Sequence, residues 1–353
     1  MKSKIAGTGY YVPEEVVTNF DLEKIIDTSD AWIQERTGIK ERRFAKKGEE
    51  TTSTMGAAAA RMAIHNAGIE TEEVDFIIMA TLSPDYYFPG AGVLVQRELG
   101  LQKKEVGALD IRTQCTGFIY ALSVADQFIR GGMYKNILVI GSEMHSMGMD
   151  MTTRGRGISV IFGDGAGAVV LQAVGDEEKS GILSSNLHAN GDFAEELAMV
   201  SPGSHAGYHE KNPAKYGAEG ASVYDSVFIT PEVVENGLYF PYMNGQLVFK
   251  NAVIKFTQTI NEALAKTGKT KEDIDMLIPH QANLRISQFI QKRMGLRDDQ
   301  VWNNIQRYGN TTAASIPIAL AEAVQNEAIQ RGDLVCLSAF GSGFTWGSVL
   351  LNY

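Results

Sequence analysis

Short apolar runs alternate with amphipathic segments along most of the chain. The apolar runs predict strands at 5–7, 74–80, 107–111, 136–140 and 166–172. Segments whose apolar residues recur at helical spacing predict helices at 54–66, 91–98, 117–130, 245–266, 284–294 and 313–327. Strands and helices that alternate in this way indicate an α/β protein whose sheets are largely buried.

An internal repeat runs through this pattern. Its matched landmarks are the segments 73–80 and 273–280, the residues Cys115 and Asn310, and the glycine-rich runs 162–167 and 340–344. Cys115 and Asn310 each come shortly before a predicted helix. Matched landmarks in the same order favour a duplicated α/β half over coincidence among apolar strands. Such a duplication predicts a boundary near residue 173, with Cys115, His280 and Asn310 close to a pseudo-twofold axis.

One stretch breaks the pattern. From 193 to 242 the chain is rich in Gly, Pro, Tyr, His and charged residues and has no helical period. Loops of this length are uncommon and are usually functional or mobile. We interpret the stretch as an insertion in the second half, which either covers a site or extends an interface.

Composition narrows the class of protein. The 353 residues are 44% hydrophobic, and 32 basic against 42 acidic side chains give a net charge of −10, which disfavours nucleic-acid binding. Two cysteines do not make a disulfide framework, so we expect free thiols and a cytoplasmic protein. No apolar segment follows the N-terminal lysines, and no apolar run approaches the roughly 20 residues of a membrane span. We therefore expect neither a signal peptide nor a membrane segment.

Cys115 lies between the strand predicted at 107–111 and a long helix that begins at Gly117. Free N–H groups and the helix macrodipole favour the thiolate there, so we expect a pKa below the usual value of about 8.5. The alternative is a cysteine that packs as a small hydrophobe, and position alone supports both equally. Cys336, inside the apolar run 334–337, is expected in the core.

His280 and Asn310 also lie at the ends of predicted elements. His280 follows an apolar strand and Pro279. Catalytic groups are common where a strand ends in an α/β fold, although position alone favours a satisfied, partly buried histidine. Asn310 could cap a helix, or its amide could donate to a developing oxyanion.

The other histidines and glycine runs carry weaker signals. The histidines without such a position are His65, His145, His188, His205 and His209. The last two are four residues apart, but without a helix or a third ligand they indicate surface loop residues, and we expect no metal site. The run 340–347 can bring backbone N–H groups close to a ligand or form a turn. The run 163–168 lacks the spacing of a nucleotide phosphate loop.

Taken together, these segments resemble β-ketoacyl-acyl carrier protein synthase III, one of the thiolase-fold condensing enzymes. The matching segments are 28–33, 36–39, 115–118, 162–168, 279–285, 309–311 and 340–347, and they extend over nearly the whole chain. The resemblance implies a thiolase-like α/β fold of two duplicated halves, in α-β-α-β-α layers with pseudo-twofold symmetry. Residues 1–172 would carry Cys115, and residues 173–353 would carry His280, Asn310 and the insertion at about 193–242.

The resemblance also implies a reaction that initiates fatty acid biosynthesis. The family's Cys-His-Asn triad maps onto Cys115, His280 and Asn310. Cys115 would take an acyl group from acyl-coenzyme A, and a malonyl group on acyl carrier protein would then lose carbon dioxide and attack it. The backbone N–H groups of Cys115 and Ser342 would form the oxyanion hole of the first stage, and neutral His280 and Asn310 would stabilise the malonyl enolate in the second. No cofactor is implied, since acyl-coenzyme A is a substrate.

The same resemblance implies binding residues. Trp32, Arg36 and Arg156 would contact coenzyme A by stacking on adenine and pairing with phosphate. In a homodimer, Phe88 would line the acyl pocket of the partner subunit. Phe340 would border the acyl pocket as a gate, and Asn283 would lie near the triad.

The acidic carrier protein needs local positive charge on this acidic chain. Candidates for this contact are Lys250, Arg285, Lys292 and Arg293. A solvated helix face explains each of these residues equally well. The carrier-protein surface is therefore a prediction about a group of residues.

The chain departs from the family pattern at Thr113, Gln114 and Thr116, which flank the cysteine, and at the insertion. Both changes lie near the place where acyl selectivity would be set, so a branched, longer or unusual primer competes with acetyl. A relative of secondary metabolism is the main alternative. A non-catalytic partner subunit is disfavoured because the triad is complete, and a degradative thiolase because Cys336 lies in a strand before the glycine run.

Overall fold

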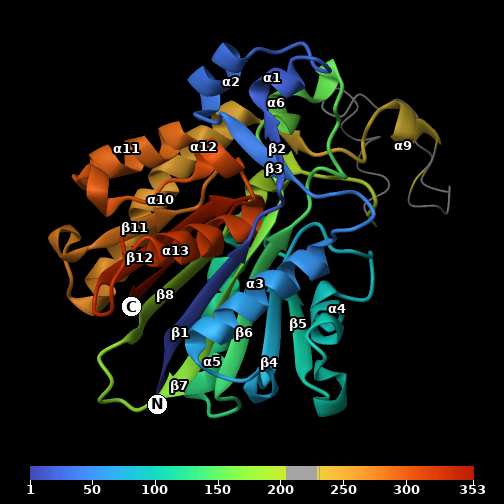
Figure 1. The fold of residues 1–353 in the computed structure, drawn as a ribbon. Coiled ribbons are helices and arrows are strands. Elements are labelled where there is room, and N and C mark those ends of the chain that lie inside the picture. The colour runs from blue at the N-terminus through green and yellow to red at the C-terminus, as the bar shows by residue number, and fades with distance from the viewer. Residues whose placement is uncertain (204–228, 230) are drawn as a thin grey trace.

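The structure is a computed structural model and describes residues 1–203, 229 and 231–353. Two sheets dominate it (Figure 1). The first has the order β1 (Lys2–Tyr11), β7 (Gly165–Val174), β6 (Asn136–Glu143), β4 (Phe76–Ala80) and β5 (Gly107–Ile111). The second has the order β11 (Met276–Pro279), β12 (Leu334–Gly341), β13 (Thr345–Asn352) and β8 (Gly181–Ala189).

The two sheets repeat one topology. β4 pairs in parallel with β6 as β11 pairs with β12, and β7 and β13 follow as antiparallel neighbours. Beyond β11, Val301 forms a single parallel bridge to Leu277 where β5 stands in the first sheet. Asp75 accepts the N–H of Asn136, and Asp275 accepts the N–H of Leu334, at matching positions. The predicted duplication is confirmed; the domain boundary near 173, between β7 and β8, stays a prediction.

Helices complete five layers. α5 (Gly117–Arg130) and α13 (Ser315–Gln325) lie between the sheets, α3 (Thr52–Ala67) and α4 (Ala91–Glu98) cover the first, and α10 (Gly245–Thr267) and α11 (Leu284–Met294) cover the second. Alternate strand residues pack on opposite layers: Ile78 against the middle helices, Ile77 and Met79 against the outer ones.

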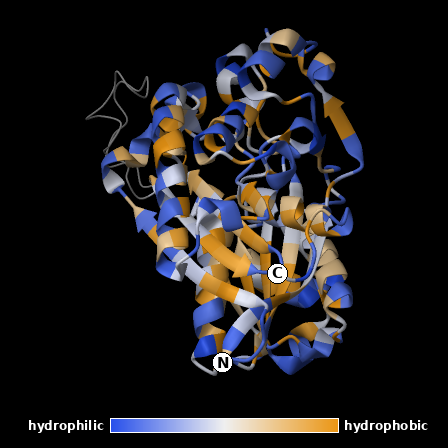
Figure 2. Cartoon of the chain, turned by 90° about the vertical axis from the view of Figure 1, so that its left-hand side faces the viewer, coloured by the Kyte–Doolittle hydropathy of each residue, from blue (hydrophilic) through white to orange (hydrophobic). Residues whose placement is uncertain are grey.

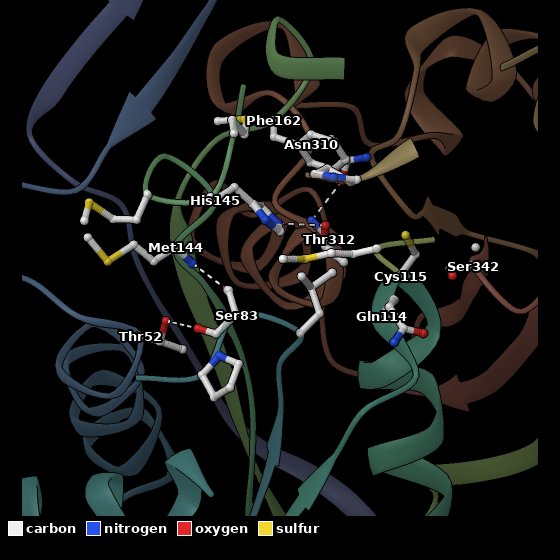
Figure 3. Close-up of a pocket in the computed structure, with 18 of the residues that line it drawn as sticks. Thr52, Ser83, Gln114, Cys115, Met144, His145, Phe162, Asn310, Thr312 and Ser342 are labelled. Atoms are coloured by element: carbon white, nitrogen blue, oxygen red, sulfur yellow. Dashed lines mark hydrogen bonds between the residues drawn. The ribbon is translucent and has the colours of Figure 1, made fainter. Parts of the chain in front are cut away.

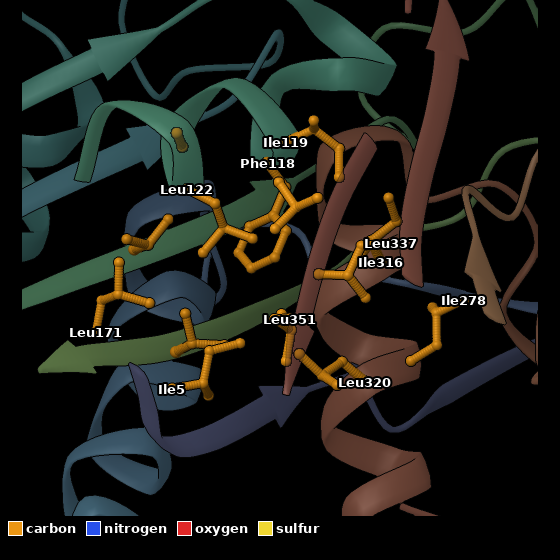
Figure 4. Close-up of a cluster of buried hydrophobic side chains, with 14 of the residues drawn as sticks. Ile5, Phe118, Ile119, Leu122, Leu171, Ile278, Ile316, Leu320, Leu337 and Leu351 are labelled. Atoms are coloured by element: carbon orange, nitrogen blue, oxygen red, sulfur yellow. The ribbon is translucent and has the colours of Figure 1, made fainter. Parts of the chain in front are cut away.

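The middle layer holds the largest cluster of buried side chains. Leu122 of α5 and Leu320 of α13 meet residues from both sheets there (Figure 4). Burying each such side chain contributes about 1.5–3 kcal/mol. Figure 2 shows the strands as the most hydrophobic elements, with mixed helices around them. Helices α5 and α13 are therefore held in place by the largest cluster of buried side chains.

Several predicted helices have the bounds given above, namely 91–98, 117–130 and 284–294. The helix predicted at 313–327 is shorter, because a 3-10 turn at Thr312–Ala314 precedes α13. All five predicted strands exist and most are longer. β8 had not been predicted, because polar Ser184, Ser185 and Asn186 interrupt its apolar pattern.

Smaller elements form a cap beside the first sheet. They are β2 (Glu15–Thr18), α1 (Asn19–Leu22), α2 (Asp30–Thr37), β3 (Glu41–Phe44), α6 (Arg156–Ser159) and α12 (Ile305–Tyr308). Ile33, Ile39, Val160 and Ile305 pack together in this cap. The cap carries Trp32 and Arg36 on α2.

The insertion has some regular structure in its described part. β9 (Leu197–Ala198) pairs with β10 (Tyr242–Met243), and α9 (Pro231–Glu235) lies between them in sequence. The five residues of α9 are too few to show a helical period, which agrees with the absence of such a period from the sequence of this stretch. Residues 204–228 and 230, with His205 and His209, lie outside the described residues.

Neither a membrane span nor a metal cluster is found in the described part of the chain. No helix there is long and apolar enough to cross a bilayer. No group of three or more His, Cys, Asp or Glu side chains there could hold a metal ion.

Candidate active site

A pocket of about 1060 Å³ opens where the two halves meet. Cys115, His280 and Asn310 all line it, together with Phe340 and Ser342 from the end of β12 and the turn after it. Figure 3 shows Cys115 beside Ser342, with Asn310 and His145 across the pocket. The structure therefore brings together the three residues that sequence analysis singled out.

Cys115 stands in the 3-10 turn Gln114–Thr116, between β5 and α5. The turn requires a left-handed backbone at Gln114, with φ of +46°. A side chain at Gly341 would clash with the cysteine, because an added Cβ would lie 2.4 Å from the Cys115 Cβ. Only glycine therefore leaves room for the thiol at this point.

The thiol does not have the low pKa expected for a helix N-terminus. Burial, and then the negative charge of Glu143, raise the pKa of Cys115 to about 12, against the N–H groups of Ser342 and of Cys115 itself. The expectation of a depressed pKa is wrong in this structure, because the side chain is only 8% exposed to water. The same two N–H groups are the pair predicted for the oxyanion hole.

His280 follows β11 and is held by Ser315. Its Nδ1 lies 2.6 Å from the Ser315 Oγ, which also accepts the N–H of Gln281 at 3.3 Å. The tautomer in which the Ser315 hydroxyl donates to Nδ1 places the ring proton on Nε2. Nε2 is buried and has no hydrogen-bond partner among the described residues.

His280 is neutral at physiological pH. Burial, and then the nearby His145, lower its pKa to about 3. A neutral imidazole with a free Nε2–H is a hydrogen-bond donor that faces the pocket. This is the protonation state that the sequence-based hypothesis required.

Asn310 is held through both its backbone and its side chain. Its backbone N–H donates to Ile161, and its carbonyl accepts from Gly163. Its Oδ1 accepts the N–H of Thr312 at 2.8 Å. The Nδ2 amide group is thereby left as the donor for a ligand.

Two further residues of the predicted site lie at the end of β12. Phe340 is buried, packs edge-on against Phe344 at 4.9 Å between ring centroids, and forms part of the pocket wall. The Ser342 hydroxyl donates to the carbonyl of Leu197 at the edge of the insertion. The side chain of Ser342 is therefore used to fix its own backbone.

The residues predicted to bind coenzyme A form a second cluster. The guanidinium carbons of Arg36 and Arg156 lie 4.4 and 5.1 Å from the ring centroid of Trp32. Trp32, Arg36 and Arg285 line a side pocket that shares Asn283 with the main one. The two pockets therefore adjoin.

Asn283 links this cluster to α11. Its Oδ1 caps the helix by accepting the N–H of Arg285 at 2.9 Å, and its Nδ2 donates to the carbonyl of Arg36 at 2.8 Å. It lines the same pocket as Cys115, His280 and Asn310. These two bonds give it a structural role at the junction of α2 and α11.

The predicted carrier-protein residues lie on two packed helices. Lys250 is on α10, and Arg285, Lys292 and Arg293 are on α11; all four are exposed. Lys292 and Arg293 occupy the last turn of α11, where the helix dipole also favours cations. These positions therefore fit both a carrier-protein surface and a solvated helix face.

Phe88 does not reach the pocket of its own chain. Its side chain is 80% exposed, and the neighbouring Pro84, Asp85 and Tyr86 line the pocket instead. A single chain therefore leaves a large aromatic ring in solvent beside the site.

Sequence analysis missed four residues that support the site: Glu143, His145, Thr312 and Ser315. His145 had been grouped with histidines that lack a site position, which is wrong, because it lines the pocket and is only 7% exposed. Its signal was the one used for His280, a polar residue just after a buried strand. The β6 strand was predicted to end three residues too early for that signal to be seen.

Comparisons with known proteins show which family this chain resembles. Two family models match, "3-Oxoacyl-[acyl-carrier-protein (ACP)] synthase III" at residues 109–191 and its C-terminal counterpart at 264–353. A "Beta-ketoacyl-[acyl-carrier-protein] synthase III" of Aquifex aeolicus is 44% identical over 353 residues, with all of both chains covered. One of Xanthomonas euvesicatoria pv. vesicatoria is 44% identical over 99% of this chain and 98% of its own.

A solved structure matches as well. The crystal structure of 3-oxoacyl-[acyl-carrier-protein] synthase III from Aquifex aeolicus superimposes with a TM-score of 0.84 at 44% identity. The match covers 99% of this chain and all of the other. The thiolase-like arrangement of the two sheets is therefore shared along the whole chain.

Proposed function

This chain belongs to the β-ketoacyl-acyl carrier protein synthase III family, the thiolase-fold acyltransferases that initiate fatty acid synthesis, and we propose that Cys115, His280 and Asn310 carry its reaction. The observation that supports this assignment most is the meeting of three groups in one pocket. They are a thiol facing two backbone N–H groups, an imidazole with an unpartnered Nε2, and an oriented carboxamide.

In the first stage Cys115 attacks the carbonyl of an acyl-coenzyme A thioester. The N–H groups of Cys115 and Ser342 stabilise the tetrahedral oxyanion. Because the raised pKa keeps the thiol protonated at neutral pH, its proton leaves as the new bond forms. The coenzyme A sulfur departs with that proton as the free thiol, and the acyl group stays on Cys115.

In the second stage a malonyl thioester on acyl carrier protein replaces coenzyme A. Its carboxylate leaves as carbon dioxide, and the electron pair of the broken bond forms an enolate. Nε2–H of His280 and Nδ2–H of Asn310 donate to the enolate oxygen. The enolate carbon attacks the acyl carbonyl, the carbon–sulfur bond to Cys115 breaks, and the β-ketoacyl product stays on the carrier protein. Cys115 leaves as a thiolate, which takes up a proton from water. Losing one donor of this kind costs about 3–4 kcal/mol of barrier.

Coenzyme A would enter past Trp32, Arg36 and Arg156. Two guanidinium groups over one indole offer both a stacking surface and charges for phosphate. Trp32 and Arg36 line the side pocket, which shares Asn283 with the pocket that holds the thiol. A pantetheine arm has the extended shape that such a path requires.

The acidic carrier protein would dock on Lys250, Arg285, Lys292 and Arg293. Reversing the charges of Lys292 and Arg293 should weaken the use of malonyl-carrier protein but leave acyl transfer from coenzyme A unchanged. Charge reversal at Lys266 and Lys269, exposed at the far end of α10, is the matched control. An equal loss in both half-reactions would exclude this surface.

The active assembly would be a homodimer in the cytoplasm. β5 is an edge strand of the first sheet, and Tyr86, Tyr87 and Phe88 are exposed near it. Pairing of two such edges would cover this apolar surface and bring Phe88 to the acyl pocket of the partner. A monomer at micromolar concentration in light scattering would contradict this part of the proposal.

Intact-mass analysis tests the reaction directly. The protein should gain one acyl group from a panel of acyl-coenzyme A thioesters, acetyl, branched and longer, and the panel identifies the primer. Adding malonyl-carrier protein should then release carbon dioxide and a β-ketoacyl product. A head-to-head product or an acylated hydroxyl would instead assign the chain to a branch of secondary metabolism.

A further inference from the structure

A second histidine, outside the assigned triad, is connected to Asn310. The Nε2 of His145 lies 2.8 Å from the Oγ1 of Thr312, and both side chains are buried. The N–H of the same Thr312 donates to Oδ1 of Asn310 at 2.8 Å. Figure 3 shows the chain of contacts from His145 through Thr312 to Asn310.

Thr312 is an unusual residue for this connection. Its φ is +45°, in the left-handed region that β-branched residues avoid. The N–H that holds the Asn310 side chain belongs to this residue. A hydrogen bond that anchors the Thr312 hydroxyl therefore also anchors the peptide group that sets the direction of the Asn310 amide.

His145 is itself fixed by its surroundings. Its ring packs on Phe162, with 4.8 Å between centroids, and Phe162 forms a parallel bridge with Asn310. The next residue, Ser146, is tied to the buried carboxylate of Asp164 through its N–H and its hydroxyl. His145 thus contacts the Thr312 side chain and the ring of Phe162, whose backbone pairs with that of Asn310.

We call the 3-10 turns Gln114–Thr116 and Thr312–Ala314, which lead into α5 and α13, the two elbows of the fold. The elbow at Gln114–Thr116 lacks such an anchor among the described residues. Gln114 has the same backbone conformation before Cys115, with φ of +46°. Among the residues that the structure describes, its side-chain amide reaches only the carbonyl of Arg112, at 3.5 Å. The buried histidine is a feature of the Asn310 side of the pocket alone.

We propose that His145 is a positioning residue for the decarboxylating half-reaction, which it supports by holding Thr312 and, through it, the carboxamide of Asn310. The proposal rests on the proposed function, in which Asn310 donates to the malonyl enolate. His145 does not need to touch the substrate for this role. Because the donor acts on the enolate, loss of the anchor should slow condensation and spare acyl transfer to Cys115.

The test compares Thr312→Val, Thr312→Ser and His145→Leu. Valine keeps the shape of threonine and removes only the hydroxyl, whereas serine retains it. We expect Thr312→Val and His145→Leu to lower kcat for condensation with malonyl-carrier protein by about tenfold or more, with little change in KM. The rate of Cys115 acylation from acyl-coenzyme A, measured by intact mass in a rapid quench, should stay within about twofold. Thr312→Ser should recover most of the kcat lost in Thr312→Val.

The most decisive comparison is a double-mutant cycle of His145→Leu and Thr312→Val. If His145 acts through Thr312, the double variant should be no slower than either single variant. Additive losses, a parallel fall in acylation, or Thr312→Ser as slow as Thr312→Val would overturn the proposal. Should Thr312→Val fail to fold, His145→Leu against Thr312→Ser gives the same comparison. Failure of the wild-type protein to condense would instead contradict the proposed function.

Discussion

The two halves of the molecule present the same elbow to the same pocket with different chemistry. Gln114 and Thr312 have φ of +46° and +45°, and each begins a 3-10 turn that leads into a middle-layer helix. The structural counterpart of Cys115 is therefore Ala313. The sequence had paired Cys115 with Asn310, three residues too early, because only side-chain landmarks were compared.

The strand ends opposite these elbows differ in the same way. β6 ends in Glu143 and β12 ends in Gly341, at equivalent positions. Glu143 accepts the N–H of Ala313 at 3.4 Å, whereas Gly341 lies against Cys115. Each strand end thus supports the elbow of the other half. The carboxylate of Glu143 lies beside Ala313, whereas the residue beside the nucleophile Cys115 is a glycine, Gly341.

The ends of β4 and β11 repeat the contrast. Thr81 follows β4 and donates to the buried Glu143 at 3.1 Å, whereas His280 follows β11 and directs Nε2 into the pocket. One half therefore uses its polar groups to satisfy each other. The other half leaves one donor unsatisfied, which is the condition for binding a ligand there.

Moving the thiol between the elbows is the strongest way to break the comparison. Cys115→Ala should abolish the acyl adduct, since no other thiol in the described part of the chain lines the pocket. Cys115→Ala combined with Ala313→Cys should also form none, because the new thiol would face Glu143 and lack the Ser342 N–H. Intact mass after incubation with acyl-coenzyme A distinguishes these outcomes. An adduct on the relocated thiol of the double variant would show that the elbows are chemically interchangeable.

Thr81 and His280, the first residues after β4 and β11, should differ sharply in their effects. His280→Ala should lower condensation by about 10²–10³-fold, as loss of an enolate donor does, and should leave acylation largely intact. Thr81→Ala should only lower stability, by about 1–3 kcal/mol, because its hydroxyl donates to Glu143 and accepts the N–H of Ser83. Half-reaction rates and thermal denaturation measure the two effects. Similar losses of condensation in both variants would contradict the division of roles.

The parts of the fold and of the site that depend on local sequence patterns could be predicted, and those that depend on contacts between distant residues could not. Helix bounds such as 284–294 followed from local periodicity and from the terminal Gly295. Cys115, His280 and Asn310 were assigned through the family resemblance, since their positions at the ends of predicted elements left each role open. The role of His145 depends on Thr312, 167 residues away. The raised pKa of Cys115 depends on burial and on Glu143, which no local pattern reports.

Gly341→Ala tests whether space at the strand end decides where the thiol can stand. The added Cβ would overlap the Cys115 side chain and displace it from the N–H group of Ser342. We expect acylation to fall by about tenfold to a hundredfold, at a stability cost of about 1–3 kcal/mol. Gly191→Ala is the control, since its added Cβ would meet no atom within 4 Å. Acylation at the wild-type rate in Gly341→Ala would show that the pocket adapts.

Glu143→Gln should give the smallest effect, a shift in the pH dependence of thiol reactivity. The pKa of Glu143 is about 7, raised by burial, so the carboxylate is charged in the alkaline range where the Cys115 thiol ionises. A negative charge raises the pKa of Cys115, so its removal should lower that pKa by on the order of one unit. The midpoint of alkylation by iodoacetamide should move to lower pH accordingly. Glutamine also turns an amide NH₂ toward the N–H donors that Glu143 accepts, which lowers stability, so each rate must be measured well below the melting temperature. A midpoint that stays in place would mean that burial alone sets the pKa of the thiol, and that the carboxylate of the other elbow has no part in it.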